Sequence, residues 1–142
     1  MITDFQYLQD LVLRRKLKGE GALFHVDQLY TVAFRLNGNP VTVTVPVDFD
    51  TDLASIPAIV PRFVAQQVDA GLEAAVVHDW LYWSREFPRD VADGVFLAAL
   101  LAAGVPAWRA RVMYAAVRLA GGAYFQVEEE GRPPLPPTAH AA

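Results

Sequence analysis

Valine stands at every second position from Val41 to Val47, and this run constrains the fold more than any other feature of the chain. Side chains of a strand alternate between its faces, so the four valines share one face. Tyr30–Leu36 alternates in part, and Asn37–Pro40 lies between the runs as a turn, because Asn-Gly tolerates positive φ. The sequence predicts an antiparallel hairpin with one buried face, in which Pro46 ends the second strand or marks a sheet edge.

Before and after this hairpin, the spacing of apolar residues along the sequence is less regular. Phe5–Leu17 fits either a helix or a strand, and both alternatives stay open. Ala22–Val26 is short and apolar enough for a strand, and Asp48–Pro57 has the composition of a loop.

After this loop the apolar spacing changes to that of helices. Pro88 and Pro106 suit helix starts, Gly104 suits a helix end, and we expect Gly121-Gly122 to stop the last helix. The predicted helices are Ile59–Gln67, Gly71–Ser84, Pro88 to about Ala103, and one from Pro106 to the glycine pair. The last is amphipathic, since its three arginines lie among apolar neighbours.

These elements predict an α+β fold, with a small N-terminal antiparallel hairpin or sheet followed by a compact bundle of three to four helices. We expect residues 1–127 to form a single compact domain. Residues 128–142 are polar and rich in proline, which predicts a polyproline II tail. That tail is either flexible or docks on a neighbouring chain.

Composition excludes several classes of protein. The 142 residues include no cysteine, which removes disulfides, thiolate zinc sites and cysteine nucleophiles. The net charge of −4 argues against a nucleic-acid partner.

Met1–Asp4 does not resemble a signal peptide. The longest uncharged apolar stretch, Gly94–Trp108, contains a glycine and a proline and is shorter than the roughly 20 residues of a spanning helix, so no transmembrane segment is expected.

One ionisable pair, His78 and Asp79, lies in the otherwise apolar segment Ala74–Tyr82. Burying an imidazole and a carboxylate costs several kcal/mol unless both find partners. Adjacent helical residues diverge by about 100°, so the two do not simply pair, whereas Tyr82 lies one turn beyond His78 on the same face. Two hypotheses remain: a satisfied structural network, or a catalytic or metal site.

A second acidic residue, Asp93, follows near the start of the next predicted helix. Helices joined by a short loop pack antiparallel, so Asp93 can approach His78. A carboxylate on the far ring nitrogen would fix the tautomer and raise the basicity of the imidazole. The alternative is an acidic residue that only stabilises the helix N-terminus.

Alternating acidic residues, Asp48, Asp50 and Asp52, follow the valine strand. They resemble the start of an EF-hand loop, but Leu53 and Ile59 stand where that loop needs glycine and glutamate. Two alternatives remain for these carboxylates. They bind calcium or magnesium in another kind of oxygen-ligand site, or they cap helices and close the loop.

The segments Phe49–Pro57 and Ala75–Tyr82 together resemble a family found in phages and prophages, the domain of unknown function 1353. Its pattern pairs an F-x-T-D-x-A-S-I-P loop with an H-D-x-L-Y helix and a later acidic and aromatic position, here Asp93 and Phe96. The resemblance covers roughly Tyr30–Gly121. It implies a phage or prophage origin, often among virion genes, and no known activity.

The H-D-x-x-Y helix is also similar to that of phospholipase A2. This likeness implies His78 as the base that activates water, Asp93 as its orienting carboxylate and Tyr82 as support. It implies Asp79 as a calcium ligand, with Asp50 and Asp52 completing the metal shell. The disulfides and the glycine-rich calcium loop of phospholipase A2 are absent from this sequence.

Three functions therefore remain after the sequence has been read. The favoured hypothesis is a virion or tail-associated structural protein of a phage, located in the virion or the host cytoplasm, whose C-terminal tail binds other virion proteins or a second copy. The alternative is a metal-assisted, calcium-dependent hydrolase acting on lipid or another cell-envelope substrate. The third is a small intracellular effector of host defence.

Overall fold

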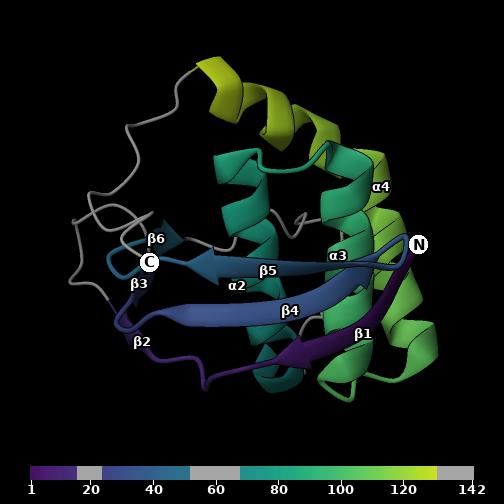
Figure 1. Ribbon diagram of the computed structural model, residues 1–142. Helices are drawn as coiled ribbons and strands as arrows, with labels where there is room; N and C mark the ends of the chain where they lie inside the picture. Colours follow the sequence, from purple (N-terminus) through teal and green to yellow (C-terminus); the bar gives the residue numbers. More distant parts are fainter. Residues whose placement is uncertain (16–23, 52–67, 131–142) are drawn as a thin grey trace. The chain divides into compact units, whose positions relative to one another are not determined.

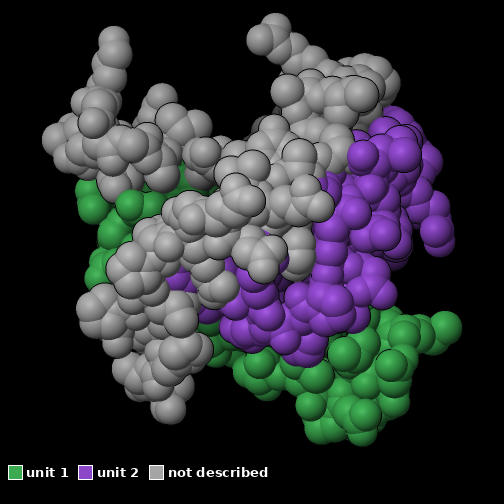
Figure 2. All heavy atoms as spheres, turned by 90° about the horizontal axis from the view of Figure 1, so that it is seen from above, with its two compact units in different colours: residues 1–52, 133–142 green, residues 53–132 purple. Residues whose placement is uncertain are grey.

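The computed structural model describes residues 1–15, 24–51 and 68–130. The chain divides into two compact units, and their described residues lie within residues 1–51 and within residues 68–130 (Figure 2). Several predictions fall outside the described residues: the short helix Ile59–Gln67, the metal ligand Asp52 and most of the proline-rich tail.

The first unit contains a three-stranded antiparallel sheet in the order β1-β4-β5 (Figure 1). The strands are β1 (Ile2–Tyr7), β4 (Tyr30–Leu36) and β5 (Asn39–Val45). Strand β1 lies in the segment whose type the sequence left open. The predicted hairpin of β4 and β5 is confirmed, and alternate side chains on one face are buried: Tyr30, Val32, Phe34, Val43 and Val45.

The hairpin turn consists of two residues with positive φ, Asn37 at 51° and Gly38 at 85°. This is the type I′ geometry that matches the twist of paired strands. Asn39 and Pro40, expected in the turn, are already paired in β5. Strand β5 lies at the sheet edge and ends immediately before Pro46, as predicted, because proline has no N–H for a further ladder bond.

A second small sheet in the same unit has the order β2-β3-β6, with β2 (Leu13–Arg15), β3 (Phe24–Val26) and β6 (Asp50–Thr51). The expectation that residues from Asp48 form only a loop is wrong at β6. Backbone pairing explains the difference, since Val26 donates to Phe49 at 3.0 Å and accepts from Asp48 at 2.9 Å. These bonds align β6 with β3, a tertiary constraint that local composition does not reveal.

The described part of the second unit contains three helices, α2 (Val68–Ser84), α3 (Arg89–Ala102) and α4 (Ala107–Glu130), each in contact with the other two (Figure 1). The α+β fold is therefore confirmed, with three helices among the described residues. Helix α2 is buried on nearly all sides, which explains its almost continuous apolar sequence. None of the described helices is long and apolar enough to cross a membrane.

The helix starts follow the prolines as predicted, and Gly104, at a φ of 91°, follows α3. The predicted stop at Gly121-Gly122 is wrong, because α4 continues to Glu130, three residues into the expected tail. Gly121 is buried, and a Cβ atom there would lie 2.6 Å from the hydroxyl of Tyr82. This glycine provides space for a neighbouring side chain and does not end the helix.

Candidate functional site

Helix α2 places His78 and Tyr82 one turn apart, with ring centroids separated by 4.2 Å. Neither side chain has solvent-exposed surface. The same helix buries Asp79, which keeps only 7% of its surface exposed. The long apolar run of α2 thus contains buried polar groups, and buried polar groups require partners.

Asp93, from the first turns of α3, is the partner of His78. Its Oδ1 atom lies 2.7 Å from Nε2 of the imidazole, and both side chains are fully buried. The antiparallel packing of α2 and α3 expected from their short connection brings the two residues together. This contact is the first of the two alternatives that the sequence left open for Asp93.

Three further side chains surround Asp93. The Tyr82 hydroxyl donates to Oδ1 at 2.6 Å, and Nη1 of Arg118 on α4 donates to Oδ2 at 2.8 Å. Arg89 lies one turn before Asp93, donates to the Tyr82 hydroxyl at 3.3 Å and also donates to backbone carbonyls of α4. One buried carboxylate therefore joins all three helices, with both of its oxygens used.

These contacts shift the protonation equilibria in a consistent way. Burial alone would raise the pKa of Asp93, but hydrogen bonds from His78, Tyr82 and Arg118, with the positive charge that His78 carries when it is protonated, outweigh burial and hold that pKa below its usual value. Burial and the adjacent carboxylate raise the pKa of Tyr82. The bond to Asp93 raises the pKa of Arg118. The stable arrangement is an ionised Asp93 that accepts from His78, Tyr82 and Arg118.

The other ring nitrogen of His78, Nδ1, is buried and has no hydrogen-bond partner among the described residues. Because the ionised Asp93 accepts at Nε2, the neutral imidazole carries its proton on Nε2 and presents a lone pair at Nδ1. Phe96 of α3 contacts the same ring at a centroid distance of 4.7 Å. A histidine with one nitrogen held by a carboxylate and the other available to accept a proton is the arrangement of a general base.

The proposed metal ligands are distributed differently. Asp79 lies next to His78 in the helical unit, Asp50 belongs to the sheet unit, and Asp52 is not among the described residues. No group of three His, Cys, Asp or Glu side chains suited to a metal occurs in residues 1–15, 24–51 and 68–130. Of the three proposed ligands, Asp79 is the one that the described part of the helical unit contains.

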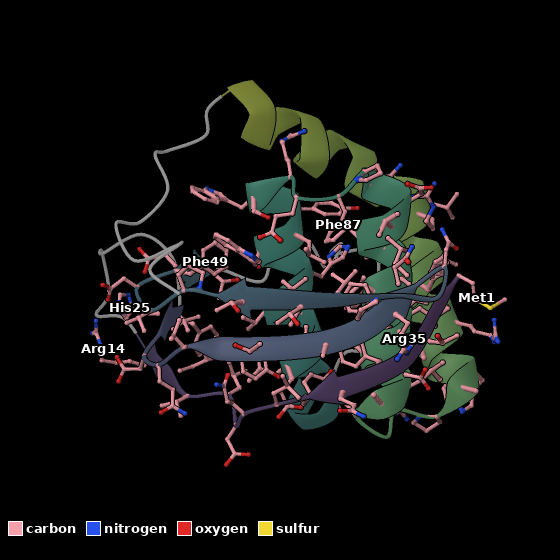
Figure 3. All side chains as sticks on the ribbon, viewed as in Figure 1. Met1, Arg14, His25, Arg35, Phe49 and Phe87 are labelled. Carbon is pink, nitrogen blue, oxygen red and sulfur yellow. The ribbon has the colours of Figure 1, made fainter. Side chains whose placement is uncertain are left out.

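Sequence reasoning missed a second histidine cluster, in the sheet unit. His25 on β3 lies 2.8 Å from Asp48 through Nε2 and 2.9 Å from Asp50 through Nδ1 (Figure 3). The alternating acidic residues thus bind the two ring nitrogens of one histidine. The pairing of β3 with β6 brings them together, and only recognition of that two-residue strand in the sequence could have predicted the cluster.

Comparison with curated proteins gives no match, and comparison with solved structures gives none either. The family model described as a protein of unknown function, DUF1353, matches residues 24–117 of the 142. The matched region includes His78, Tyr82 and Asp93, and it ends one residue before Arg118. The match covers well over half of the chain, and the chain belongs to the DUF1353 family.

Proposed function

We propose that the chain is a hydrolase in which His78 is the general base. The observation that carries this proposal is the asymmetry of its imidazole. Nε2 is held by Asp93 at 2.7 Å, while Nδ1 is buried with no partner among the described residues. A purely structural histidine gains stability by satisfying both nitrogens, since a buried unsatisfied group costs about 1–3 kcal/mol. A base instead needs one nitrogen with an available lone pair.

The proposed reaction is hydrolysis of a carboxylic ester, a bond found in the lipids that the sequence-based hydrolase hypothesis gave as one substrate class. Nδ1 takes a proton from a water molecule as the water oxygen attacks the carbonyl carbon. Nδ1 then returns that proton to the departing alcohol as the ester C–O bond breaks. Asp93 positions the ring and stabilises the transient imidazolium, and Tyr82 fixes Asp93. Because His78 has no exposed surface, the reaction requires the Nδ1 side of the ring to open to water.

Calcium remains part of this proposal through Asp79, the one proposed ligand that lies in the described part of the helical unit. Calorimetric titration of the native chain with calcium tests this idea, and Asp79→Asn is the matched variant. Saturable binding that the variant abolishes supports the metal-assisted form of the proposal. If the folded native chain takes up no calcium, the metal step is wrong.

The hydrolase itself is tested with a soluble chromogenic ester and with phospholipid vesicles. We expect His78→Asn to lower the rate by about a hundredfold or more, because it removes the base. His25→Asn is the matched control, since it alters the other histidine that contacts carboxylates and should leave the rate unchanged. Hydrolysis that survives in His78→Asn, or no hydrolysis by the folded native chain, would sink the proposal.

A second candidate function is a structural protein of a phage virion or tail, present in the virion or the host cytoplasm. The complete burial of His78 and Asp93, in a network that joins three helices, favours it. In that case residues 128–142 bind other virion proteins or a second copy. Loss of stability in His78→Asn, with no hydrolysis by the native chain, is the result that favours this candidate.

A further inference from the structure

Helix α4 carries apolar side chains on two opposite faces. One face is buried in the helical unit and consists of Ala110, Met113, Val117 and Gly121. The other face is exposed and consists of Trp108, Val112, Ala115 and Leu119, hereafter the exposed stripe. Leu119 follows Val117 by two residues, which is about 200° around the helix axis, so the stripe lies opposite the buried face.

The exposed stripe is unusual for a helix packed on one side. Such a helix normally shows a single apolar face and a polar opposite face. Isolated exposed apolar residues are common, but these four recur at spacings of four, three and four, which aligns them along the axis. Trp108 is 55% exposed and Leu119 is 89% exposed, so the stripe presents large side chains to solvent.

The charges beside the exposed stripe all have one sign. Arg111 is exposed on one side of it, and Arg109 on the other side places its guanidinium 5.3 Å from the centroid of the Trp108 ring. From Ala107 to Val127 the sequence of α4 contains no Asp or Glu. From Trp108 to Leu119 the solvent-facing part of α4 therefore combines apolar side chains with positive charge, whereas the same helix ends in Glu128, Glu129 and Glu130.

We propose that the exposed stripe of α4 binds the surface of an anionic lipid bilayer. Helices that lie in the membrane interface pair an apolar face, often including tryptophan, with flanking arginine or lysine. The arginines meet lipid phosphates while the tryptophan and leucine enter the boundary of the acyl chains. A second copy of the stripe would be a poorer partner, because the two surfaces would carry positive charge only.

This inference deepens the proposed function and rests on it only for the identity of the substrate. If the chain is a hydrolase, the lipid at this surface is the class of substrate presented to it. Binding itself needs no hydrolysis, so it can be measured on His78→Asn, in which the proposed base is absent. Failure to bind vesicles and failure to hydrolyse a soluble ester are then separate results.

The test is co-sedimentation of the full chain with vesicles of phosphatidylcholine containing phosphatidylglycerol, compared with pure phosphatidylcholine. We expect binding to the anionic vesicles that weakens at high salt, and a loss of about fivefold in affinity in Arg111→Gln. Leu119→Ser should also weaken binding. Leu8→Ser is the matched control, because Leu8 is an exposed leucine of the sheet unit at 50% exposure.

Three results would overturn the proposal. One is no difference between anionic and neutral vesicles. Another is equal loss of binding in Leu119→Ser and Leu8→Ser, which would place the contact elsewhere. The third is a dimer in solution that Leu119→Ser dissociates, without vesicle binding by the native chain. That result would assign the stripe to self-association.

Discussion

Nε2 of His78 lies 2.7 Å from Oδ1 of Asp93, and the two residues are 15 positions apart in the sequence and fully buried. The contact joins α2 to α3, and the Arg118 bond to the other oxygen of Asp93 extends it to α4. Removing Asp93 therefore affects both the proposed base and the packing of the helical unit. The consequences for stability and for activity can be separated by experiment.

Asp93→Asn should lower the free energy of unfolding by about 1–3 kcal/mol, because it places an amide where a buried carboxylate accepted hydrogen bonds from His78, Tyr82 and Arg118, while the Arg118 side chain, 37% exposed, stays in contact with water. Urea unfolding followed by circular dichroism measures this change. Asp90→Asn is the matched control on the same helix, since Asp90 is exposed in the first turn. Similar small losses in the two variants would show that the buried network contributes little to stability.

The sequence could suggest the His78–Asp93 contact, as one of two alternatives for Asp93, because two simple rules apply to it. A polar pair in an apolar helix requires partners, and a short connection makes the helices antiparallel. Arg89 and Arg118 were not assigned to the site, because their roles depend on the position of α4 around the helical unit. No local pattern along α4 determines which of its residues face Asp93.

Gly121→Ala should destabilise the protein by about 1–3 kcal/mol, since the added methyl group would lie 2.6 Å from the Tyr82 hydroxyl. In the background of Tyr82→Phe that hydroxyl is absent, and the nearest ring carbons would lie at 3.5 Å. The same alanine should then be neutral or stabilising, because alanine favours helix by about 1 kcal/mol over glycine. A double-mutant cycle by urea unfolding measures the coupling.

The control for this cycle is Gly122→Ala, where the added group would meet Arg89 at an ordinary 3.6 Å. We expect it to stabilise the protein slightly in both backgrounds. A cost of Gly121→Ala that persists in Tyr82→Phe would mean that the backbone, and not the hydroxyl, limits this position. The sequence-based helix end was wrong because two adjacent glycines look the same in a sequence whether they end a helix or leave space for a neighbouring side chain.

Gly38→Ala tests a glycine that is required for a different reason. No atom lies within 4 Å of a Cβ at this position, but its φ of 85° is a conformation that L residues rarely adopt. We expect a loss of about 1 kcal/mol in the free energy of unfolding, from backbone strain alone. Substitution to asparagine should cost less than alanine, because asparagine tolerates positive φ, and equal losses would contradict this explanation.

The sheet unit shows the limits of sequence reading in the same way. The valine alternation identified β4 and β5 because one face is buried and the turn residues are specific. Strands β2 and β6 have three and two residues, too few for any periodicity to be visible. Their positions depend on pairing with β3, which is also what brings His25 between Asp48 and Asp50.

Stability should fall at acid pH through Asp93. Its pKa in the folded chain lies below the ordinary value of 3.8, so between the two pKa values the unfolded chain binds more protons. The contribution of Asp93 is therefore fully present above the unfolded value and is lost as the pH falls through the folded one. The difference in unfolding free energy between the native chain and Asp93→Asn should be constant above about pH 5 and shrink below about pH 4.

Urea titrations at a series of pH values measure this difference directly. Asp90→Asn serves again as the control, because Asp90 is an exposed carboxylate on the same helix. Other carboxylates titrate in the same range, but they do so equally in the native chain and in the variant, and the subtraction removes them. A difference that stays constant from pH 6 to about pH 3 would show that Asp93 is not held ionised by His78, Tyr82 and Arg118.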